Sequence, residues 1–472
     1  MAETDGHDEL GVRATVRRLF ALERDVLVLS VAMFAFSLGF QMTSRYVPRY
    51  MSVLGAGAVA VGLFGTAGNL VGAVYPYPGG AVSDRIGSRL ALTLFGLTST
   101  VGFVVWLFAP LFGTVRLPAV GSTIDVAGRE TVVGWSEPDV VPVGIFLGLL
   151  FAQAWKSFGL GATFAVVKQA VEPDRLATGF ASTETVRRTA FLLGPLLAAG
   201  ILSIFAFESG FRVVLAVAAG FGLLATVVQH FLYDASGDTV GKSFEGVGTV
   251  VDDLRSMPDP LRPLLLADTA IRFANGMVYV FFVIVVTEFL EVGATLPVVG
   301  RLSPDAYFGV LLALQFVVAL LVMAPVARLT RRVGLKPVVA AGFLVYAVFP
   351  VLLISAPADP AIVALLFAFS GLRFAGLPAH KAMIVGPAER DAGGRVTGTY
   401  YLLRNAVVVP SAALGGWLYG SDWRVALPLD AVGLPGVTVA AGPELAFGTA
   451  TVVGLVGVAY FAVYGREFEA YA

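Results

Sequence analysis

The sequence predicts an all-α polytopic membrane protein with twelve transmembrane helices, arranged as two six-helix halves. Three observations lead to this prediction: the composition, the spacing of the apolar runs and an internal repeat. Of the 472 residues, 57% are hydrophobic and 14% are charged, and the mean hydropathy is +0.82. Ordinary soluble proteins contain about 45–50% apolar and about 25% charged residues. The chain is therefore expected to lie in a lipid bilayer.

The spacing of the apolar runs gives the number of helices. A helix needs about 20 mostly apolar residues to cross the hydrocarbon core of a bilayer. Candidate runs lie near residues 25–50, 57–79, 88–112, 142–169, 178–206, 211–233, 263–290, 304–327, 337–357, 360–387, 396–420 and 444–464. A polar segment divides them into two groups of six. The predicted organisation is a tail at 1–24, an N-terminal half at 25–233, a linker at 234–262, a C-terminal half at 263–464 and a tail at 465–472.

The basic residues of the short loops predict the orientation. They fall on the side that both tails share: Arg85, Arg89, Lys168, Arg175, Arg328, Arg331, Arg332, Lys336, Arg390 and Arg395. Loops rich in Lys and Arg face the cytoplasm in most membrane proteins. We therefore expect a multi-pass protein of the cell membrane with both termini and the linker in the cytoplasm. The N-terminal tail is polar and of mixed charge, unlike a cleaved signal, and is expected to be retained.

Three loops on the opposite side are longer than a simple connection requires. The loop at 114–135 alternates β-branched and polar residues between glycines, which is typical of a β-hairpin. The segments 424–440 and 292–303 have a similar composition. Small β-rich outer loops are therefore expected, and the alternative is ordinary loops of β-like composition.

An internal repeat relates the two halves. The stretch "KSFGLGATFAVVKQAVEPD" from Lys156 aligns with "RFAGLPAHKAMIVGPAERD" from Arg373, and "SDRIGSR" at 83–89 aligns with "TRRVGLK" at 330–336. An even number of spans separates equivalent positions, so the halves are predicted to be parallel repeats about an axis along the membrane normal. Such repeats bind their substrate between the halves near the bilayer midplane.

Lys156 and Arg373 occupy equivalent positions near the middle of spans four and ten. A charge at that depth costs about 2.5–3.5 kcal/mol on insertion scales, so each side chain must face protein or water. One interpretation is a structural ion pair or a hydrogen bond between helices. The other is a shared cavity, which better explains two cations at the same depth in both halves.

The sequence around the second loop resembles the major facilitator superfamily. The segment "GAVSDRIGSR" is similar to the family motif between spans two and three, carried here by Gly80, Asp84, Arg85, Gly87 and Arg89. The resemblance extends over the whole chain and implies a secondary carrier that works by alternating access. It also implies that these five residues gate the cytoplasmic face, with Asp84 directed at the start of span eleven, 393–398. The alternative for this motif is a basic loop that only sets the topology.

The resemblance further implies that spans one, four, seven and ten line a central cavity. The polar or aromatic candidates for substrate binding in these spans are Gln41, Arg45, Trp155, Lys156, Arg272, Asn275 and Arg373. Asp268 and Arg272 stand four residues apart, which suits an ion pair on one helix. If transport is coupled to protons, the carboxylates placed to take them up are Glu184 and Asp268. A run in span five, "FLLGPLLAAG", also resembles a patch found in antiporters of the family.

The excess of cations at mid-depth favours an organic anion as substrate, held by Lys156 and Arg373 from opposite halves. The alternative function is a broad-specificity antiporter that exports drugs or amphipathic compounds between aromatic walls at Phe151, Trp155, Phe158 and Phe374.

Other classes of protein lack support in the sequence. There is no cysteine, no HExxH or GxSxG motif, and the segment "GDTVGKS" is one residue too short for a phosphate-binding loop. Neither an enzyme nor a metal or cofactor site is therefore expected, and the net charge of −1 indicates no nucleic-acid partner. The expected state is a monomer whose partners are a small-molecule substrate, the lipid bilayer and, under proton coupling, protons.

Overall fold

The computed structural model describes residues 24–126, 129–135, 137–157, 176–233, 259, 261–297, 300–374, 376–385, 393–421, 424–427 and 437–467. The predicted N-terminal tail, nearly all of the predicted linker and the end of the C-terminal tail lie outside these residues, as does the second part of the predicted run 142–169. Their predicted boundaries therefore stay predictions.

The helices of the first half follow the six predicted runs. They are α2 (Arg24–Thr43) with α3 (Val47–Val53), α4 (Ala58–Val74) with α5 (Pro76–Ile86), α6 (Ser88–Leu107), α7 (Val143–Ala152), α9 (Leu176–Leu202) and α10 (Phe207–Leu232). A short 3-10 helix, η1 (Ala109–Phe112), follows α6. Within this half, α2 packs against α9 and α10, and α6 packs against α10 and α7.

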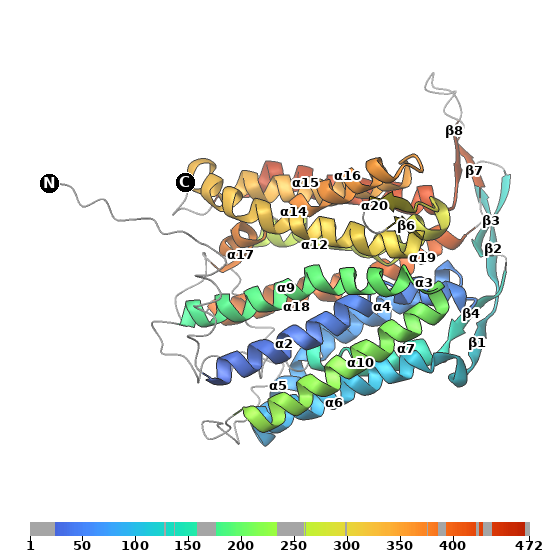
Figure 1. Cartoon of the computed structure of the whole chain (residues 1–472). Helices are drawn as coiled ribbons and strands as arrows, with labels where there is room; N and C mark the ends of the chain where they lie inside the picture. Colours follow the sequence, from blue (N-terminus) through green and yellow to red (C-terminus); the bar gives the residue numbers. More distant parts are fainter. Residues whose placement is uncertain are drawn as a thin grey trace.

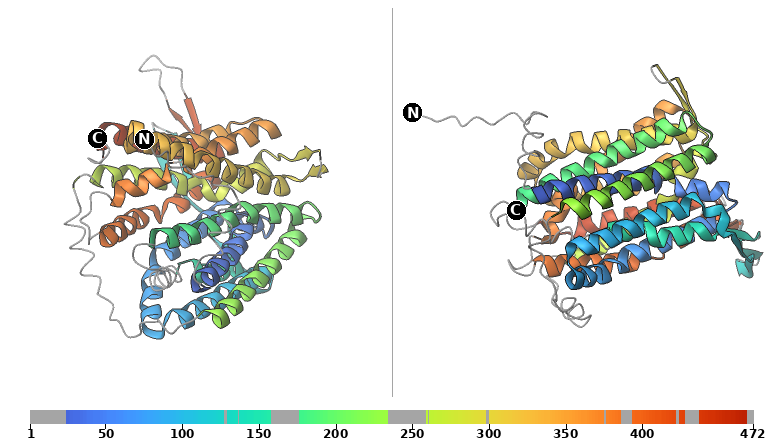
Figure 2. Two further views of the ribbon diagram at one scale, coloured as in Figure 1. Left: turned by 60° about the vertical axis from the view of Figure 1, so that its left-hand side comes forward. Right: turned by 60° about the horizontal axis from the view of Figure 1, so that its bottom comes forward.

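The helices of the second half follow the other six runs. They are α12 (Leu261–Val278) with η2 (Tyr279–Phe281), α13 (Phe282–Ile284) and a π-helical turn η3 (Val285–Phe289), α14 (Pro304–Val333), α15 (Leu335–Ile354), α16 (Pro360–Gly371) with η4 (Leu372–Phe374) and α17 (Leu377–Val385), α18 (Gly393–Val408) with α19 (Ser411–Gly420), and α20 (Pro443–Tyr464). Here α20 packs against α12 and α15, and α14 packs against α16. The left view of Figure 2 separates the two halves by colour.

The surface of the bundle is suited to lipid. Eight helices of the described residues are long and apolar enough to cross a membrane. Large apolar side chains are exposed on the outer helix faces, among them Leu224, Phe231, Leu321, Leu365 and Val456. A water-soluble protein rarely exposes so much contiguous apolar surface. The prediction of a polytopic helical membrane protein is therefore confirmed.

Four antiparallel strand pairs lie at one end of the described bundle (Figure 1). We call this end the hairpin side. Strand β2 (Val120–Val126) pairs with β3 (Arg129–Trp135), and β1 (Thr114–Leu117) pairs with β4 (Asp139–Pro142). Strand β5 (Ala294–Leu296) pairs with β6 (Gly300–Leu302), and β7 (Arg424–Leu427) pairs with β8 (Val437–Ala440). The three predicted β-rich loops are therefore confirmed.

The hairpin side is tied to the helices by Asp139. Its carboxylate accepts hydrogen bonds from the backbone N–H of Gly57 (2.6 Å) and of Ala60 (2.8 Å) at the start of α4. The first N–H groups of a helix have no partner within the helix, and a carboxylate there also meets the positive end of the helix dipole. Asp139 thereby fixes the end of the β1–β4 pair to span two.

The turn after the second helix of each half shows the repeat directly. Gly87, between α5 and α6, has φ +83°, and Gly334, between α14 and α15, has φ +86°. This left-handed backbone is easily reached only by glycine. The two aligned loop sequences therefore make the same turn, as the repeat predicts.

Candidate functional site

The four spans predicted to line a cavity are all interrupted at a similar depth. In span one a turn at 44–46 separates α2 from α3, and in span four α7 ends before a turn at Gln153, with a last helical turn reaching Ser157. Span seven changes to η2 at Tyr279, and span ten changes to η4 at Leu372. Interrupted helices expose backbone polar groups, which membrane proteins tolerate only inside protein or beside a water-filled cavity.

Proline and glycine account for two of the interruptions. Pro48 lies in the first turn of α3, and Pro378 directly follows the first residue of α17. Proline cannot donate a backbone hydrogen bond, so it is tolerated in the first turn of a helix but not farther in. Gly371 ends α16 where a Cβ atom would lie 2.5 Å from the backbone oxygen of Gln315 in α14. That close approach places η4 against span eight.

A cavity of about 600 Å³ lies between the halves at the depth of these interruptions. Its polar lining comes from both halves and consists of Gln41, Ser44, Arg45, Asn69, Gln153, Lys156, Ser157, Tyr279, Arg404 and Asn405. Its larger apolar side chains are Phe40, Phe64, Trp106, Leu149, Val280 and Val408. Three lining residues are cationic, and none of the described lining residues is acidic. We call this space the central cavity.

Arg45 and Lys156 hold their positions in the central cavity through aromatic rings. The guanidinium carbon of Arg45 lies 4.0 Å from the centre of the Tyr279 ring, and the Lys156 Nζ lies 4.3 Å from the centre of the Phe40 ring. Lys156 is exposed within the bundle. Within the described part of the chain, neither cation has a hydrogen bond or an ion pair with a carboxylate. Both are therefore available to an anion.

Arg404 belongs to a different arrangement, centred on Asp268. The fully buried Asp268 carboxylate is 3.0 Å from Arg404 Nη1, 3.3 Å from Arg272 Nε and 3.4 Å from His380 Nε2. The Tyr400 hydroxyl also donates to it, at 3.2 Å. These groups come from α12, α17 and α18, so we call them the Asp268 cluster. The predicted Asp268–Arg272 pair is present, and it is part of a larger cluster that joins three helices of the second half.

Arg373 is buried beside the central cavity instead of lining it. Its side chain is enclosed by the rings of Tyr346, Phe374 and Phe349, whose centres lie 4.9, 4.8 and 5.8 Å from the guanidinium carbon. The amide of Gln315, turned so that its oxygen faces the guanidinium, accepts from Nη2 and Nε. The interruption at η4 turns Arg373 toward α14 and α15, which explains why it does not lie opposite Lys156.

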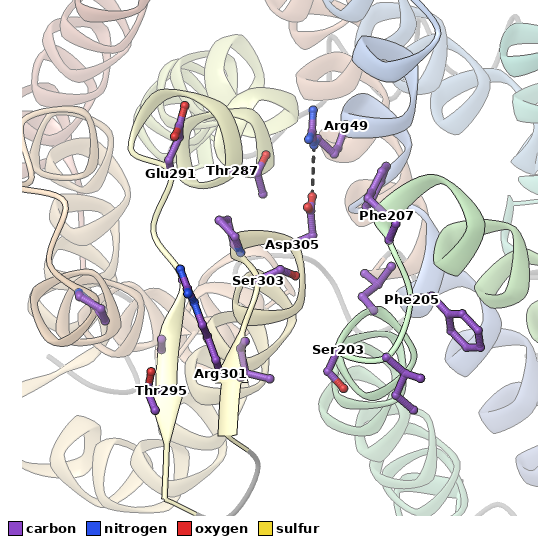
Figure 3. A pocket seen from close by; sticks show the side chains of 18 residues that line it. Arg49, Ser203, Phe205, Phe207, Thr287, Glu291, Thr295, Arg301, Ser303 and Asp305 are labelled. Atoms are coloured by element: carbon purple, nitrogen blue, oxygen red, sulfur yellow. Dashed lines mark hydrogen bonds and ion pairs between the residues drawn. The ribbon is translucent and has the colours of Figure 1, made fainter.

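The hairpin side of the bundle is closed. The side chain of Arg49, on α3 of the first half, lies 2.6 Å from Glu288 and 3.1 Å from Asp305 of the second half, and the Tyr46 hydroxyl donates to the backbone oxygen of Asp305. We call these four residues the Arg49 lock. Figure 3 shows the Arg49–Asp305 pair beside a pocket of about 1060 Å³ between the α9–α10 loop and the β5–β6 hairpin.

Close helix packing reinforces this closure. A Cβ atom on Gly62 of α4 would lie 2.6 Å from the backbone oxygen of Ala412 in α19, and the Ala413 N–H donates to the Thr66 hydroxyl at 2.8 Å. On this side one apolar core contains residues of both halves, including Tyr46 and Phe308. Two further apolar cores lie toward the opposite side, and each of them contains residues of one half only.

On the side away from the hairpins the halves are separated by a second cavity. It has a volume of about 610 Å³ and shares Gly72, Pro76, Arg404 and Asn405 with the central cavity. It extends to Lys381 and Gly398, which are exposed. The central cavity therefore continues toward the side opposite the hairpins, where α18 begins.

The predicted substrate-binding residues have different locations. Gln41, Arg45 and Lys156 line the central cavity, and Arg272 and Asn275 line an adjoining space of about 210 Å³. Trp155 does not line the central cavity. Its ring stacks on the ring of Phe36, with 4.5 Å between the ring centres, within the apolar core of the first half. Since the helical turn after Gln153 presents only one face to the cavity, the neighbours Trp155 and Lys156 point in different directions.

The predicted coupling and gating residues are partly described. The surroundings of Gly80 and the side chains of Asp84 and Glu184 lie outside the described part of the chain, so the contact predicted for Asp84 stays a prediction. Gly87 makes the turn between α5 and α6, Arg85 is exposed, and Arg89 donates from Nε to the backbone oxygen of His230 at 2.7 Å. His230 lies in the last turn of α10, so this bond lies within the first half.

Several residues of the site were missed by the sequence analysis. Gln153, Tyr279 and Asn405 line the central cavity, and Tyr346 contacts two arginines. Polar residues inside apolar runs were a usable signal for Gln153 and Asn405. Tyr279 and Tyr346 gave no such signal, because a tyrosine within a span is equally compatible with simple packing.

The comparisons with known proteins concern the fold. No protein-family model and no curated protein sequence matches this chain. A peptide transporter, POT, in complex with sulfate is similar in structure, with 15% sequence identity, a TM-score of 0.66 and coverage of 96% of this chain and 99% of the other. A POT family transporter in complex with 5-aminolevulinic acid has 13% identity, a TM-score of 0.66 and coverage of 94% and 98%.

The nucleoside transporter NupG is also similar, with 12% identity, a TM-score of 0.63 and coverage of 93% of this chain and 99% of the other. At this level of identity the likeness defines the fold alone. The similarity covers nearly the full length of each chain and includes both six-helix halves. The chain therefore has the major facilitator fold shared by these peptide and nucleoside transporters.

Proposed function

We propose that this protein is a secondary transporter that carries a small organic anion across the cell membrane by alternating access. The observation that carries the proposal is the lining of the central cavity, which presents Arg45, Lys156 and Arg404 and, among the described residues, no carboxylate. The proposed orientation places both termini in the cytoplasm, so the hairpin side faces outward and the cavity continues inward.

Electrostatics favours an anionic substrate over a neutral one. Arg404 pairs with Asp268, whereas Arg45 and Lys156 pack on aromatic rings and have no carboxylate partner in the described part of the chain. A cation–π contact is worth about 0.5–2 kcal/mol and supplies no counter-charge to either side chain. A carboxylate or phosphate entering between Arg45 and Lys156 would supply charge-assisted hydrogen bonds to both.

The fold comparisons are consistent with this proposal. Structures of two similar transporters contain sulfate and 5-aminolevulinic acid, and both of these ligands carry a negatively charged group. The alternative, export of amphipathic compounds between aromatic walls, has less support. Two of the aromatic residues predicted for those walls, Trp155 and Phe374, pack against Phe36 and Phe316.

Transport assays with purified protein in liposomes test the proposal. We would compare uptake of benzoate and succinate with uptake of uridine and of the cationic dye ethidium, with and without a pH gradient. The expected result is uptake of an anion that is reduced at least about tenfold by Arg45→Gln and by Lys156→Gln, because each change removes a charge-assisted contact.

Arg262→Gln is the matched control, because Arg262 is exposed and pairs with Asp259 outside the cavity. This variant should transport like the wild type. Uptake of the neutral or cationic compound in preference to every anion, unchanged by Lys156→Gln, would contradict the proposal. A dependence of anion uptake on the pH gradient would add proton coupling to it.

A further inference from the structure

Arg373 is the cation whose surroundings are hardest to explain by packing alone. Its side chain is 4% exposed, and its Nη1 atom has no hydrogen-bond partner within the described part of the chain. Gln315, its polar partner, is itself 2% exposed and carries no charge. The described residues around Arg373 therefore satisfy the guanidinium only in part and leave its charge uncompensated.

Removing a cation from water without a counter-ion is unfavourable by several kcal/mol. The three surrounding rings offset a part of this, since a desolvated cation–π contact is worth about 2 kcal/mol. A purely structural role would be served as well by an uncharged side chain of similar size. The charge of Arg373 therefore suggests that an anion reaches it during the working cycle.

Arg45 connects Arg373 to the central cavity. Arg45 is close enough to interact electrostatically with Lys156 and with Arg373. The three cations come from spans four, one and ten. Within the described residues no carboxylate pairs with any of them, in contrast to Arg272 and Arg404, which both pair with Asp268.

We propose that the transported anion carries two acidic groups, one held by Lys156 and Arg45 and the other by Arg45 and Arg373. This inference rests on the proposed function and narrows it from organic anions to dianions. A compound with one acidic group would leave Arg373 uncompensated, so binding it would recover only part of the favourable energy. The second acidic group therefore determines specificity.

Tyr346 packs against Arg373 and links it to Arg272. The centre of its ring lies 5.1 Å from the guanidinium carbon of Arg272 and 4.9 Å from that of Arg373, and its hydroxyl accepts from Arg272 Nη1 at 3.3 Å. Tyr346 is therefore a positioning residue that acts through Arg373.

Binding assays with matched probes test the proposal. Succinate and its monomethyl ester have similar shapes and differ by one negative charge; malonate, glutarate and adipate with their monomethyl esters extend the series. Affinities would be measured by thermal stabilisation of the purified protein. We expect the best dianion to bind at least about tenfold more tightly than its ester, because the second carboxylate gains charge-assisted bonds.

The variants separate a specific role of Arg373 from a structural one. Arg373→Gln should weaken binding of the dianion about tenfold or more and leave binding of the ester nearly unchanged. The ratio of the two affinities should therefore approach one. Lys156→Gln should weaken both. If Arg373→Gln does not fold, Arg373→Lys is used instead, because it retains the charge but not the bidentate geometry of the guanidinium. The ratio of dianion to ester affinity in the wild-type protein tests the proposal in either case.

Two results would overturn the inference while leaving the proposed function intact. One is that the wild-type protein binds dianions and their esters with equal affinity. The other is that Arg373→Gln lowers the affinity for the dianion and for the ester by the same factor. Failure of every anion to bind or to be transported would instead refute the proposed function itself.

Discussion

The Arg49 lock and the Asp268 cluster are both built from arginines and carboxylates, but they connect different parts of the protein. The Arg49 lock joins α3 of the first half to η3 and α14 of the second. The Asp268 cluster joins α12, α17 and α18, all within the second half. The side chains of Arg49, Glu288 and Asp305 are 22%, 35% and 13% exposed, whereas Asp268 is 0% exposed.

The difference in burial matches a difference in what each group must do. Ion pairs at an exposed site are worth about 0–1 kcal/mol each, so water can replace them when the halves separate. Breaking a buried pair by removing one partner costs about 3–5 kcal/mol. In the proposed alternating-access cycle, the Arg49 lock is therefore expected to open repeatedly, while the Asp268 cluster is expected to hold three helices of one half together.

The largest expected effect is on the Asp268 cluster. Asp268→Asn leaves the guanidinium groups of Arg272 and Arg404 without their buried counter-charge. We expect it to lower the stability of the protein by about 3–5 kcal/mol. Thermal unfolding in detergent or lipid nanodiscs measures this loss.

The control is Glu208→Gln, because Glu208 pairs with Arg212 at an exposed position of α10. That change should alter the stability by less than about 1 kcal/mol. Equal stabilities of the Asp268 and Glu208 variants would show that the Asp268 cluster does not hold the second half together.

A smaller effect is expected from overpacking the contact between the halves. In Gly62→Val, the new side chain would meet the backbone of Ala412 and Gly416, which cannot yield easily. Overpacking a tight contact costs about 1–3 kcal/mol. This cost falls on the closed hairpin side, so the population should shift about five- to 150-fold toward the state open on that side.

The absence of cysteine makes this shift measurable. Ser44→Cys places a single thiol in the lining of the central cavity, and its reaction with a membrane-impermeant maleimide is followed in intact cells. Labelling should accelerate in Gly62→Val and stay unchanged in Gly220→Val, since nothing lies within 4 Å of a Cβ atom at Gly220. Equal acceleration in both variants would mean that the α4–α19 contact does not hold the closed state.

Much of this comparison could be predicted from the sequence, but not its details. The spans and hairpins were predictable because apolar length and β-type alternation are local properties of the chain. The cavity residues Gln41, Arg45 and Lys156 were expected because the family resemblance implies which spans line the cavity. The burial of Arg373 did not, because the 3-10 turn at η4 rotates its side chain relative to a continuous helix.

The two ionic groups illustrate the same limit. The Asp268–Arg272 pair was predictable because both residues stand on one helix at a spacing of four. Its links to His380, Tyr400 and Arg404 join residues more than 100 positions away, and no local pattern encodes them. The Arg49 lock was missed for the same reason: Arg49 lies 239 and 256 positions from its partners.

Removing the Arg49 lock should have a more modest effect than overpacking. Arg49→Gln removes two partly exposed ion pairs, which together are worth roughly 1–2 kcal/mol, or about a five- to thirtyfold change in population. Labelling of Cys introduced by Ser44→Cys should therefore accelerate by a factor in that range. Arg212→Gln removes an exposed pair that lies within one half, and it should leave the labelling rate unchanged. Acceleration by Arg212→Gln to the same extent would remove the distinction between pairs that cross the halves and pairs that do not.

The smallest expected effect is a response to salt that only one of the two groups shows. Raising the ionic strength from about 0.1 M to about 1 M shortens the screening length from about 10 Å to about 3 Å. The partly exposed Arg49 lock should weaken, so labelling of the Ser44→Cys protein should accelerate about two- to threefold. The labelling rate of the same protein carrying Arg49→Gln should not respond to salt, because the ion pairs of the lock are absent.

The stability difference between wild type and Asp268→Asn should also stay constant, because salt does not reach a carboxylate that is fully buried. A salt response of equal size with and without Arg49 would place the exposed ionic contact between the halves at some other residue.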